Sequence, residues 1–409
     1  MKILCVFGRH NYGQESRGTG YEYRHFIPAL KNLGHEVAFF DSWDRSAHAD
    51  FAALNRNLLE TVRREQPDTI FCVLMQYEIW TETLDLLRAS YPVRILNWGT
   101  DDSWKYNQFA RYVAPHVDLY STTYASAIRI AREHGLTNLF RTQWAADSSR
   151  LLAPLSARDC RYPVTFVGSA YGNRRKWIDD LRNRGVEVQC FGHGWDSGVL
   201  GDAEVASVIR KSVISLNFAD SPVQFFGGKA RYNRQIKART FEVPGAGGFL
   251  LSEGAEGVED YYVPDKEVVF FKDIDDLVSR IRYFLERPAE RDRIANAGFQ
   301  RTAAEHVYEK RFSALIQALS SGTADTASRR KDAPETVVAR FEKVAQRHRH
   351  SFLMRLIRML LIGPCLLIWG RRRGPRAARR ALFEISWRVA GAKVYSAAGW
   401  PGRMFYHES

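Results

Sequence analysis

The feature that most constrains the fold is a repeated alternation of strand-like and helix-like segments. In the first part of the chain, apolar strand-like runs alternate with segments of helical spacing, in the order 2–8, 23–33, 35–41, 50–65, 69–75, 81–90, 93–98, 117–121 and 125–134. The alternation then restarts, with strand-like runs at 164–168, 186–191, 213–218, 248–251 and 268–271. Such alternation with short, turn-rich links indicates parallel sheets covered by helices. We therefore expect an α/β chain with two Rossmann-like, doubly wound domains.

The same patterns divide the chain into four parts. We expect residues 1–155 to form the first α/β domain and residues 156–320 the second. Residues 321–350 begin with small, polar and basic residues and predict a linker, whereas residues 351–409 predict a basic amphipathic helical tail. Ligands of such sheets bind outside the carboxyl ends of the strands, so we expect the two domains to face a shared cleft.

The net charge is concentrated at one end of the chain. Of the formal net charge of +13, residues 321–409 carry +12, from 18 lysines and arginines against 6 acidic residues, which leaves +1 for the first 320 residues. A balanced body gives no support to nucleic-acid binding by the whole protein, and we expect no nucleic-acid partner.

The cysteines and the N-terminus indicate the compartment. Five cysteines are scattered along the chain without a metal-ligand spacing. This argues against a disulfide framework and a zinc site, and for a reducing compartment. The apolar run at 2–8 is too short for the apolar region of a signal peptide, so we expect a cytoplasmic protein.

Residues 235–251 combine cations, a carboxylate and close-packed glycines. Lys237 and Arg239 precede Glu242, and a proline and three glycines, among them Gly247, lead into the strand-like run. Cations and helix N–H groups hold phosphate, and a carboxylate accepts hydrogen bonds from a ribose. The segment therefore predicts a nucleotide-sugar site, with an ordinary surface loop as the alternative.

Two further turns are candidates for contact with an anionic ligand. A strand leads into Gly168 and Ser169, and Arg174 stands in the first turn of the following helix, where N–H groups favour anions. This turn does not match GxGxxG, so we expect no dinucleotide cofactor, and an ordinary strand-to-helix turn is the alternative. Gly18 and Gly20 would let the first loop approach donor phosphates or an acceptor, with plain loop flexibility as the alternative.

Asp101 and Asp102 follow the strand-like run at 93–98. Functional groups of doubly wound sheets collect at the carboxyl ends of strands, so Asp101 is a candidate general base or ligand of a sugar hydroxyl. Aspartate also favours helix N-caps, and capping is the alternative role for this pair. We assign the cap to Asp102.

The C-terminal tail combines apolar and basic segments. Residues 352–369 are apolar apart from Arg355, Arg358 and a Gly-Pro break, and the uncharged run 359–369 is shorter than the roughly 20 residues that span a bilayer. Six arginines follow between positions 371 and 380, and then a second amphipathic stretch. This pattern predicts helices lying on an anionic membrane surface. The alternative is a helical hairpin packed on the body or on an oligomer partner.

Several segments together resemble those of GT-B glycosyltransferases, and within that group the CgeB-like, spore-maturation-protein-like proteins. The matching segments are spread over residues 1–319: GTGYEY with IPALKNLGHEV, NWGTDDSW, LTNLFRTQWAAD, VTFVGSAYGNRRKWI, QIKARTFEVPGAGGFLL, EGVEDYYVPDKEVVFFKDIDDL and GFQRTAAEHVYEKRF. The resemblance implies sugar transfer from a nucleotide-sugar without a metal or cofactor. It also implies an N-terminal acceptor domain and a C-terminal donor domain.

The family resemblance assigns roles to individual residues. Glu242 matches the second glutamate of a Glu-x7-Glu motif, which binds the donor ribose in related retaining enzymes. Lys237 and Arg239 lie where the family places cations for the diphosphate, and with Asp101 they form the expected catalytic set. The first glutamate of the motif is replaced by Arg234, which leaves the sugar and the stereochemistry open.

These observations predict a metal-independent hexosyltransferase-type enzyme of polysaccharide biosynthesis. Its partners would be a nucleotide-sugar donor, a cell-envelope or lipid-linked glycan acceptor and an anionic membrane, which places it peripherally on the cytoplasmic membrane face. Two alternatives stay open: a catalytically weak nucleotide-sugar-binding protein, and a nucleotide-sugar hydrolase or epimerase.

Overall fold

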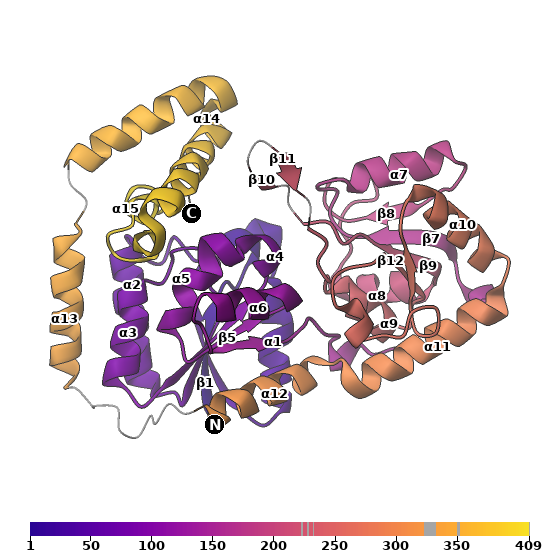
Figure 1. Ribbon diagram of the computed structural model, residues 1–409, viewed down its shortest axis with the longest axis horizontal. Coiled ribbons are helices and arrows are strands. Elements are labelled where there is room, and N and C mark those ends of the chain that lie inside the picture. The colour runs from indigo at the N-terminus through magenta and orange to yellow at the C-terminus, as the bar shows by residue number, and fades with distance from the viewer. Residues whose placement is uncertain (222–223, 227–228, 232, 323–332, 350–351, 409) are drawn as a thin grey trace. The chain divides into compact units, whose positions relative to one another are not determined.

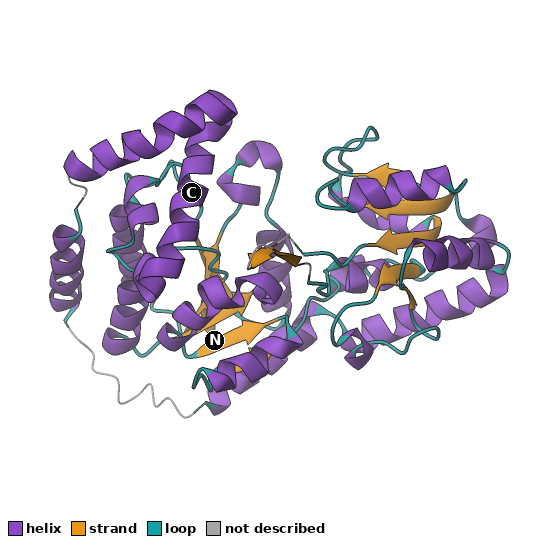
Figure 2. Ribbon diagram, turned by 45° about the horizontal axis from the view of Figure 1, so that its top comes forward, coloured by secondary structure: helices purple, strands orange, loops and turns teal. Residues whose placement is uncertain are grey.

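The computed structural model describes residues 1–221, 224–226, 229–231, 233–322, 333–349 and 352–408 (Figure 1). The chain forms two compact units. The N-terminal unit comprises residues 1–122, 127–141 and 315–409, and the C-terminal unit comprises residues 123–126 and 142–314. Each sheet has helices packed around it (Figure 2). The expected α/β class with two Rossmann-like domains is confirmed.

A six-stranded parallel sheet forms the centre of the N-terminal unit, in the order β2-β1-β3-β4-β5-β6. Its strands are β1 (Lys2–Phe7), β2 (Glu36–Asp41), β3 (Thr69–Cys72), β4 (Arg94–Gly99), β5 (Leu119–Thr122) and β6 (Leu139–Arg141). The central strands β1, β3 and β4 are mostly apolar, and they are buried except for the first residue of β1 and of β4, as expected of a sheet covered on both faces. The strand order reverses between β1 and β3, so a ligand crevice is expected at the carboxyl ends of these two strands.

Four helices of this unit follow the predicted segments: α1 (Tyr21–Asn32), α2 (Phe51–Glu65), α3 (Thr81–Ser90) and α6 (Ala125–Glu133). A helical stretch that was not predicted follows β4 and consists of α4 (Asp102–Lys105), η3 (Tyr106–Ala110), α5 (Arg111–Val113) and η4 (Ala114–His116). The capping aspartate Asp50 accepts the Ala53 N–H at 2.8 Å and so fixes the start of α2.

The C-terminal unit has a five-stranded parallel sheet in the order β13-β12-β9-β7-β8. Its strands are β7 (Tyr162–Val167), β8 (Gln189–Phe191), β9 (Ser212–Asn217), β12 (Leu250–Glu253) and β13 (Val269–Phe271). Its helices are α7 (Arg174–Asn183), α8 (Asp202–Arg210), α9 (Arg239–Gly245), α10 (Ile274–Leu285), α11 (Pro288–Glu305) and α12 (Tyr308–Ser321), the last of which runs into the N-terminal unit. A small antiparallel pair, β10 (Gln224–Phe226) and β11 (Lys229–Arg231), lies between β9 and α9 in the chain. Here the strand order reverses between β7 and β9.

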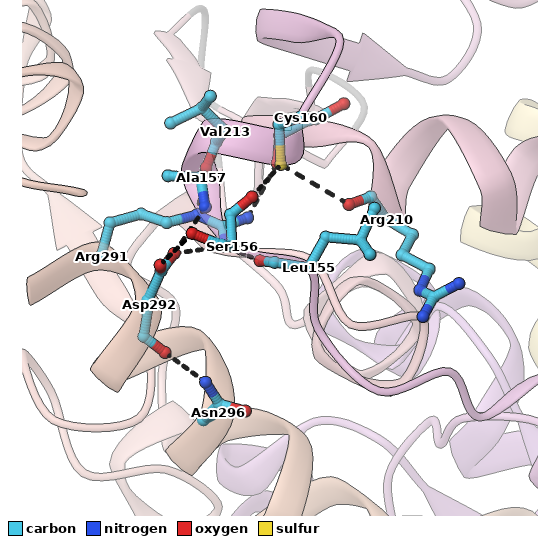
Figure 3. Close-up of polar contacts among 10 residues, drawn as sticks. Leu155, Ser156, Ala157, Cys160, Arg210, Val213, Arg291, Asp292 and Asn296 are labelled. Carbon is cyan, nitrogen blue, oxygen red and sulfur yellow. Dashed lines mark hydrogen bonds and ion pairs between the residues drawn. The ribbon is translucent and has the colours of Figure 1, made fainter. Parts of the chain in front are cut away.

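A buried arginine stabilises this sheet at the amino-terminal end of β9 (Figure 3). Arg291 on α11 is fully buried, and its guanidinium donates to the carbonyls of Ser212, Val213 and Leu155 at 2.8–2.9 Å. Asp292 accepts from the Ala157 N–H at 2.8 Å and pairs with Arg291 at 3.1 Å. The group therefore joins the segment before β7 to both β9 and α11.

The C-terminal part of the chain is folded onto the N-terminal unit. Helix α13 (Pro334–Arg347) occupies the second half of the expected linker and packs on α2 and α3, where Phe341 stacks on Trp80 with ring centroids 5.8 Å apart. The expectation of a linker throughout 321–350 is therefore wrong for α13, because its apolar face has a docking surface on this unit. The rest of that prediction falls largely on residues 323–332, outside the described residues.

The last helices also dock on this unit. They are α14 (Phe352–Ala390), η8 (Gly391–Tyr395) and α15 (Trp400–Met404). The Tyr395 hydroxyl donates to the Gln108 carbonyl, and the Tyr406 ring packs edge-on against Phe51 with centroids 4.8 Å apart. The expected tail is thus in part a folded layer of the N-terminal unit.

Helix α14 is bent into two arms, which Figure 1 shows meeting at an angle. Gly370 has φ 71° and ψ 174°, which interrupts the helix and separates a first arm (352–369) from a second arm (371–390). By length and composition, the segment Phe352–Tyr395 is the one helix among the described residues that is long and apolar enough to cross a membrane. Its most apolar 18 residues have a mean hydropathy of 1.9, and only 6% of that window is buried.

Candidate functional site

In the N-terminal unit, the loop between β1 and α1 lies at the point where the strand order reverses. Gly20 is the N-cap of α1, and its N–H donates to the Arg9 carbonyl at 2.7 Å. A Cβ at Gly20 would lie 2.9 Å from the Gly8 carbonyl oxygen, so only glycine fits. Gly18 has φ 78° and ψ 177°, a conformation that glycine alone adopts readily. The structure explains both glycines by backbone geometry, and their contact with a ligand stays a prediction.

The two aspartates after β4 have different surroundings. Asp101 occupies the N-cap position of α4 without a side-chain capping bond, and its carboxylate lies 3.9 Å from the Lys105 ammonium. Asp102 is the first residue of that helix and is buried, where it accepts from the Tyr120 hydroxyl at 3.1 Å. Burial raises the pKa of Asp102 to about 6. The assignment of the cap to Asp102 is therefore wrong, because its side chain turns into the sheet instead of toward the helix N–H groups.

A third carboxyl group in this region was not anticipated. Glu22 stands in the first turn of α1, directly after the glycine loop. Burial raises the pKa of Glu22, and the charge of Asp101 raises it further. The sequence signal that could have indicated Glu22 is a carboxylate two residues after the Gly-Thr-Gly turn that follows the first strand.

In the C-terminal unit, two arginines converge at the carboxyl end of β7. Arg174 begins α7, donates to the Ser169 carbonyl at 2.9 Å, and lies over the Tyr171 ring at 4.1 Å from its centroid. Burial lowers the pKa of Arg174, and the nearby charge of Arg239 acts in the same direction. Gly168 closes against β8, because its N–H donates to the Phe191 carbonyl at 2.8 Å. The structure therefore brings Gly168, Ser169, Arg174 and Arg239 together.

Arg239 connects this edge of the sheet to the predicted nucleotide-sugar segment. Its Nε donates to the Val167 carbonyl at 2.9 Å, and its Nη1 lies 2.5 Å from a carboxylate oxygen of Glu242. Lys237 lies in the turn before α9, partly buried, and its carbonyl accepts the Thr240 N–H at 2.9 Å. The predicted cations and carboxylate thus surround the start of α9 at the carboxyl end of β7.

Gly247 lies beyond the opposite end of α9. It has φ 75°, and a Cβ there would lie 2.4 Å from the Leu152 carbonyl oxygen. Close packing against residues 152–154 accounts for this glycine, and its assignment to the nucleotide-sugar stays a prediction.

A pair of acidic residues lies near these cations. Glu253 at the end of β12 is buried, accepts the Ala219 N–H at 2.7 Å, and lies 3.5 Å from the Arg234 guanidinium. Burial raises the pKa of Glu253, and the nearby Asp220 raises it further. Asp220 in turn accepts from the Asn173 amide at 3.0 Å. Sequence reasoning missed both residues, although Glu253 is the last residue of β12 and Asp220 lies in the loop just after β9, at the end of the sheet where ligands bind.

Within the described part of the chain, no group of three or more His, Cys, Asp and Glu side chains is arranged to hold a metal ion.

Comparison with known proteins supports the class that this fold indicates. Residues 174–317 match the family model described as "Glycosyl transferase-like". No curated protein matches the chain by sequence.

Three solved structures illustrate the similarity of fold. Sucrose-phosphate synthase from Thermosynechococcus elongatus has 11% sequence identity and a TM-score of 0.57, over 79% of this chain and 100% of that chain. Anabaena HepE, in complex with UDP-glucose, has 12% identity and a TM-score of 0.53, over 78% and 100%. The lipopolysaccharide outer core galactosyltransferase WaaB has 14% identity and a TM-score of 0.52, over 78% and 99%.

The chain therefore has the GT-B fold, and its family match together with this fold supports a glycosyltransferase. This confirms the expected enzyme class. The CgeB-like subgroup stays a prediction.

Proposed function

We propose that the protein is a metal-independent glycosyltransferase that takes its sugar from a nucleotide-sugar. The observation that carries the proposal is the cluster of Arg174, Arg239 and Glu242 at the carboxyl end of β7, where the strand order reverses. Doubly wound sheets bind their ligands at this point. A diphosphate and a ribose require cations beside a carboxylate, and HepE, of the same fold, was determined with UDP-glucose bound.

The geometry suggests how each group would act. Negative charge grows on the diphosphate as the sugar leaves, and the guanidinium of Arg239, fixed by the Val167 carbonyl, would stabilise that charge without reorganisation. A carboxylate offers about four acceptor sites. Glu242 would therefore accept from a ribose hydroxyl while it keeps its bond to Arg239.

We propose that the acceptor is a cell-envelope or lipid-linked glycan, used at the cytoplasmic face of the membrane. Asp101 after the carboxyl end of β4 and Glu22 at the start of α1 supply carboxyl groups for a general base or for binding sugar hydroxyls. The basic, apolar α14 on the same unit supports the membrane location.

Arg234 favours one alternative function. It stands where related enzymes carry the first glutamate of their motif, and it lies 3.5 Å from the buried Glu253. If the site binds the donor while the Glu253 carboxylate stays paired with Arg234, the protein would bind a nucleotide-sugar with little turnover. Hydrolysis of the donor is a further alternative, with water in place of the acceptor.

The test is to incubate the purified full-length protein with a panel of nucleotide-sugars, with and without membrane extract. We expect nucleotide release that depends on one donor and increases with the extract, with a labelled sugar in the lipid fraction. Arg239→Gln should abolish release, whereas Arg182→Ala on the exposed side of α7 should not change it. EDTA should have no effect. Donor binding without any release would favour the binding protein, and release that is independent of acceptor would favour the hydrolase.

A further inference from the structure

We propose that the hairpin of α14 is a membrane-docking element that lies flat on an anionic bilayer. Its insertion surface, which we call the outer face, comprises Leu353, Leu356, Leu360, Leu367 and Ile368 of the first arm. Membrane binding is independent of the proposed sugar transfer, whereas its consequence for the acceptor rests on that proposed function.

The outer face is a continuous apolar stripe. Leu353, Leu356, Leu360 and Leu367 recur at spacings of three, four and seven, so they lie on one side of the helix. These side chains are exposed, with 67% of Leu360, 90% of Leu367 and 68% of Ile368 accessible. Monomeric soluble proteins rarely expose apolar side chains contiguously in this way, so the stripe indicates an interaction surface.

The opposite face of the same arm is already packed. Met354 is buried with Ala378 and Leu382 of the second arm and with Phe405 after α15, and Ile357, Leu361 and Cys365 pack around them. At the bend the backbones approach closely, since a Cβ at Gly374 would lie 2.9 Å from the Cys365 carbonyl oxygen. The hairpin is therefore folded on the N-terminal unit, and its outer face points away from this packed side.

The positive charge beside the outer face indicates which partner binds there. Arg371, Arg372 and Arg373 follow the bend at Gly370 and are exposed, as are Arg376 and Arg380 on the second arm. Anionic headgroups complement this cluster, and each cation near an anionic surface adds about 1 kcal/mol to binding. A second copy of the chain would bring the same positive cluster against itself, which disfavours a homodimer across this face.

The same arginines argue that the hairpin lies in the plane of the membrane. The first arm has 18 residues, about 27 Å of helix, just short of the roughly 30 Å hydrocarbon core. If the first arm crossed the bilayer, the second arm packed against it would also enter the hydrocarbon core. The arginines at the bend would then have to pass through the core first. A flat hairpin keeps these charges among the headgroups and immerses only the outer face.

The second arm connects this surface to the candidate acceptor region. Arg379 donates to the Gln76 side chain at 2.5 Å and to the Tyr77 hydroxyl at 3.3 Å, in the loop after β3. In the same loop the Met75 carbonyl accepts from Lys105, whose ammonium lies 3.9 Å from Asp101. The hairpin is thus anchored next to the edge of the sheet that carries Asp101, where a lipid-linked acceptor would be brought by the membrane.

Flotation of the full-length protein with vesicles tests the proposal. We expect it to float with phosphatidylcholine vesicles that contain about one third phosphatidylglycerol, and more weakly with phosphatidylcholine alone. Arg371→Gln, Arg372→Gln and Arg373→Gln together should weaken binding to the anionic vesicles about a hundredfold. Leu360→Asn, Leu367→Asn and Ile368→Asn together should weaken it at least as much on both kinds of vesicle. The control is Val199→Asn with Leu285→Asn, two exposed apolar positions of the C-terminal unit, which should change nothing.

Quenching by brominated lipids tests the depth of insertion. Trp369 is half-exposed at the end of the first arm, so bound wild type should be quenched, and Trp369→Phe should lose most of that quenching while it still floats. Full-length protein that stays unbound on anionic vesicles would overturn the proposal, as would binding that both triple variants keep. If the full-length protein does not float but self-associates, and the triple asparagine variant does not self-associate, the outer face is a dimer interface instead. Donor-dependent nucleotide release, measured on the same samples, reports on the proposed function separately.

Discussion

Glu242 illustrates how one residue can have a structural bond and a predicted ligand role at once. Its carboxylate lies 2.5 Å from Arg239. If it also binds ribose, Glu242→Ala should weaken binding of the preferred nucleoside diphosphate roughly ten- to hundredfold, because a bond to a charged group is worth about 1.5–3 kcal/mol. Calorimetry with the free nucleoside should show a similar loss. Unchanged nucleoside affinity would mean that Glu242 only positions Arg239, and Glu187→Ala, at an exposed position of the same unit, is the control.

Asp102 makes the stability of the N-terminal unit depend on pH. Its folded pKa is about 6, above the value of about 3.9 in an unfolded chain. Between these values the unfolded state loses its proton and the folded state keeps it, so this group lowers stability as pH rises from about 4 to 6. The shift corresponds to about 2–3 kcal/mol. In denaturant unfolding, the free energy of unfolding of Asp102→Asn relative to wild type should therefore rise by this amount between pH 4 and 7. A difference between the two proteins that does not change with pH would contradict the raised pKa of Asp102.

Sequence reasoning named candidate site residues, and several of these lie together in the structure, but it did not determine their partners. Lys237, Arg239 and Glu242 were expected together because adjacency in the chain keeps them together in space. Asp220 follows β9 and Glu253 ends β12, and the two meet only through the strand order, in which β9 neighbours β12. Asp102 was assigned to capping because its burial depends on the position of Tyr120 on another strand. Such long-range pairings have no local signal.

At the scale of elements, Arg291 should be the most sensitive position of α11. Replacing it with Met leaves three strand and loop carbonyls without their donor, which should cost at least about 3 kcal/mol, since each buried unsatisfied group costs about 1–3 kcal/mol. Arg293→Ala on the same helix, whose side chain is exposed, should cost less than about 0.5 kcal/mol. Urea unfolding compares the two variants, and equal losses would show that the buried network contributes no more than a surface residue.

The elements themselves were largely predictable, and the exceptions have physical causes. Apolar runs of four to six residues gave β1, β3, β4 and β9, because strands buried on both faces need no polar side chains. The short β6 was missed, since three partly buried residues carry little pattern. Helix α13 was taken for linker because it follows a polar stretch and its burial comes from docking on α2 and α3.

At the scale of the whole molecule, the division into units does not follow the order of the chain. Residues 315–409 return to the N-terminal unit, so the last segment of the sequence completes the first domain. The expectation of an appended tail rested on its composition, and composition reports neither the aromatic contacts of Tyr395 and Tyr406 nor the helix pair that buries Met354. A basic and apolar segment can have one face in a protein interior and another available to a membrane.

This arrangement predicts that a chain ending at Arg349 loses stability in one unit only. Truncation would uncover the surfaces of Phe51, Phe109 and Tyr77 and remove aromatic side chains whose burial is worth about 1.5–3 kcal/mol each. Three such losses approach the 5–15 kcal/mol that stabilise a whole domain, so the N-terminal unit should melt at a much lower temperature or aggregate.

The C-terminal unit holds most of the predicted nucleotide-sugar residues and should keep its ligand-dependent transition. Calorimetric scans with and without nucleoside diphosphate separate the two transitions. The Leu360→Asn, Leu367→Asn and Ile368→Asn variant, which changes only exposed positions, should melt like wild type and so distinguish loss of packing from loss of the outer face. Equal N-terminal transitions in truncated and full-length chains would mean that residues 350–409 add no stability, and that the aromatic contacts of the last helices are too weak to hold them on this unit.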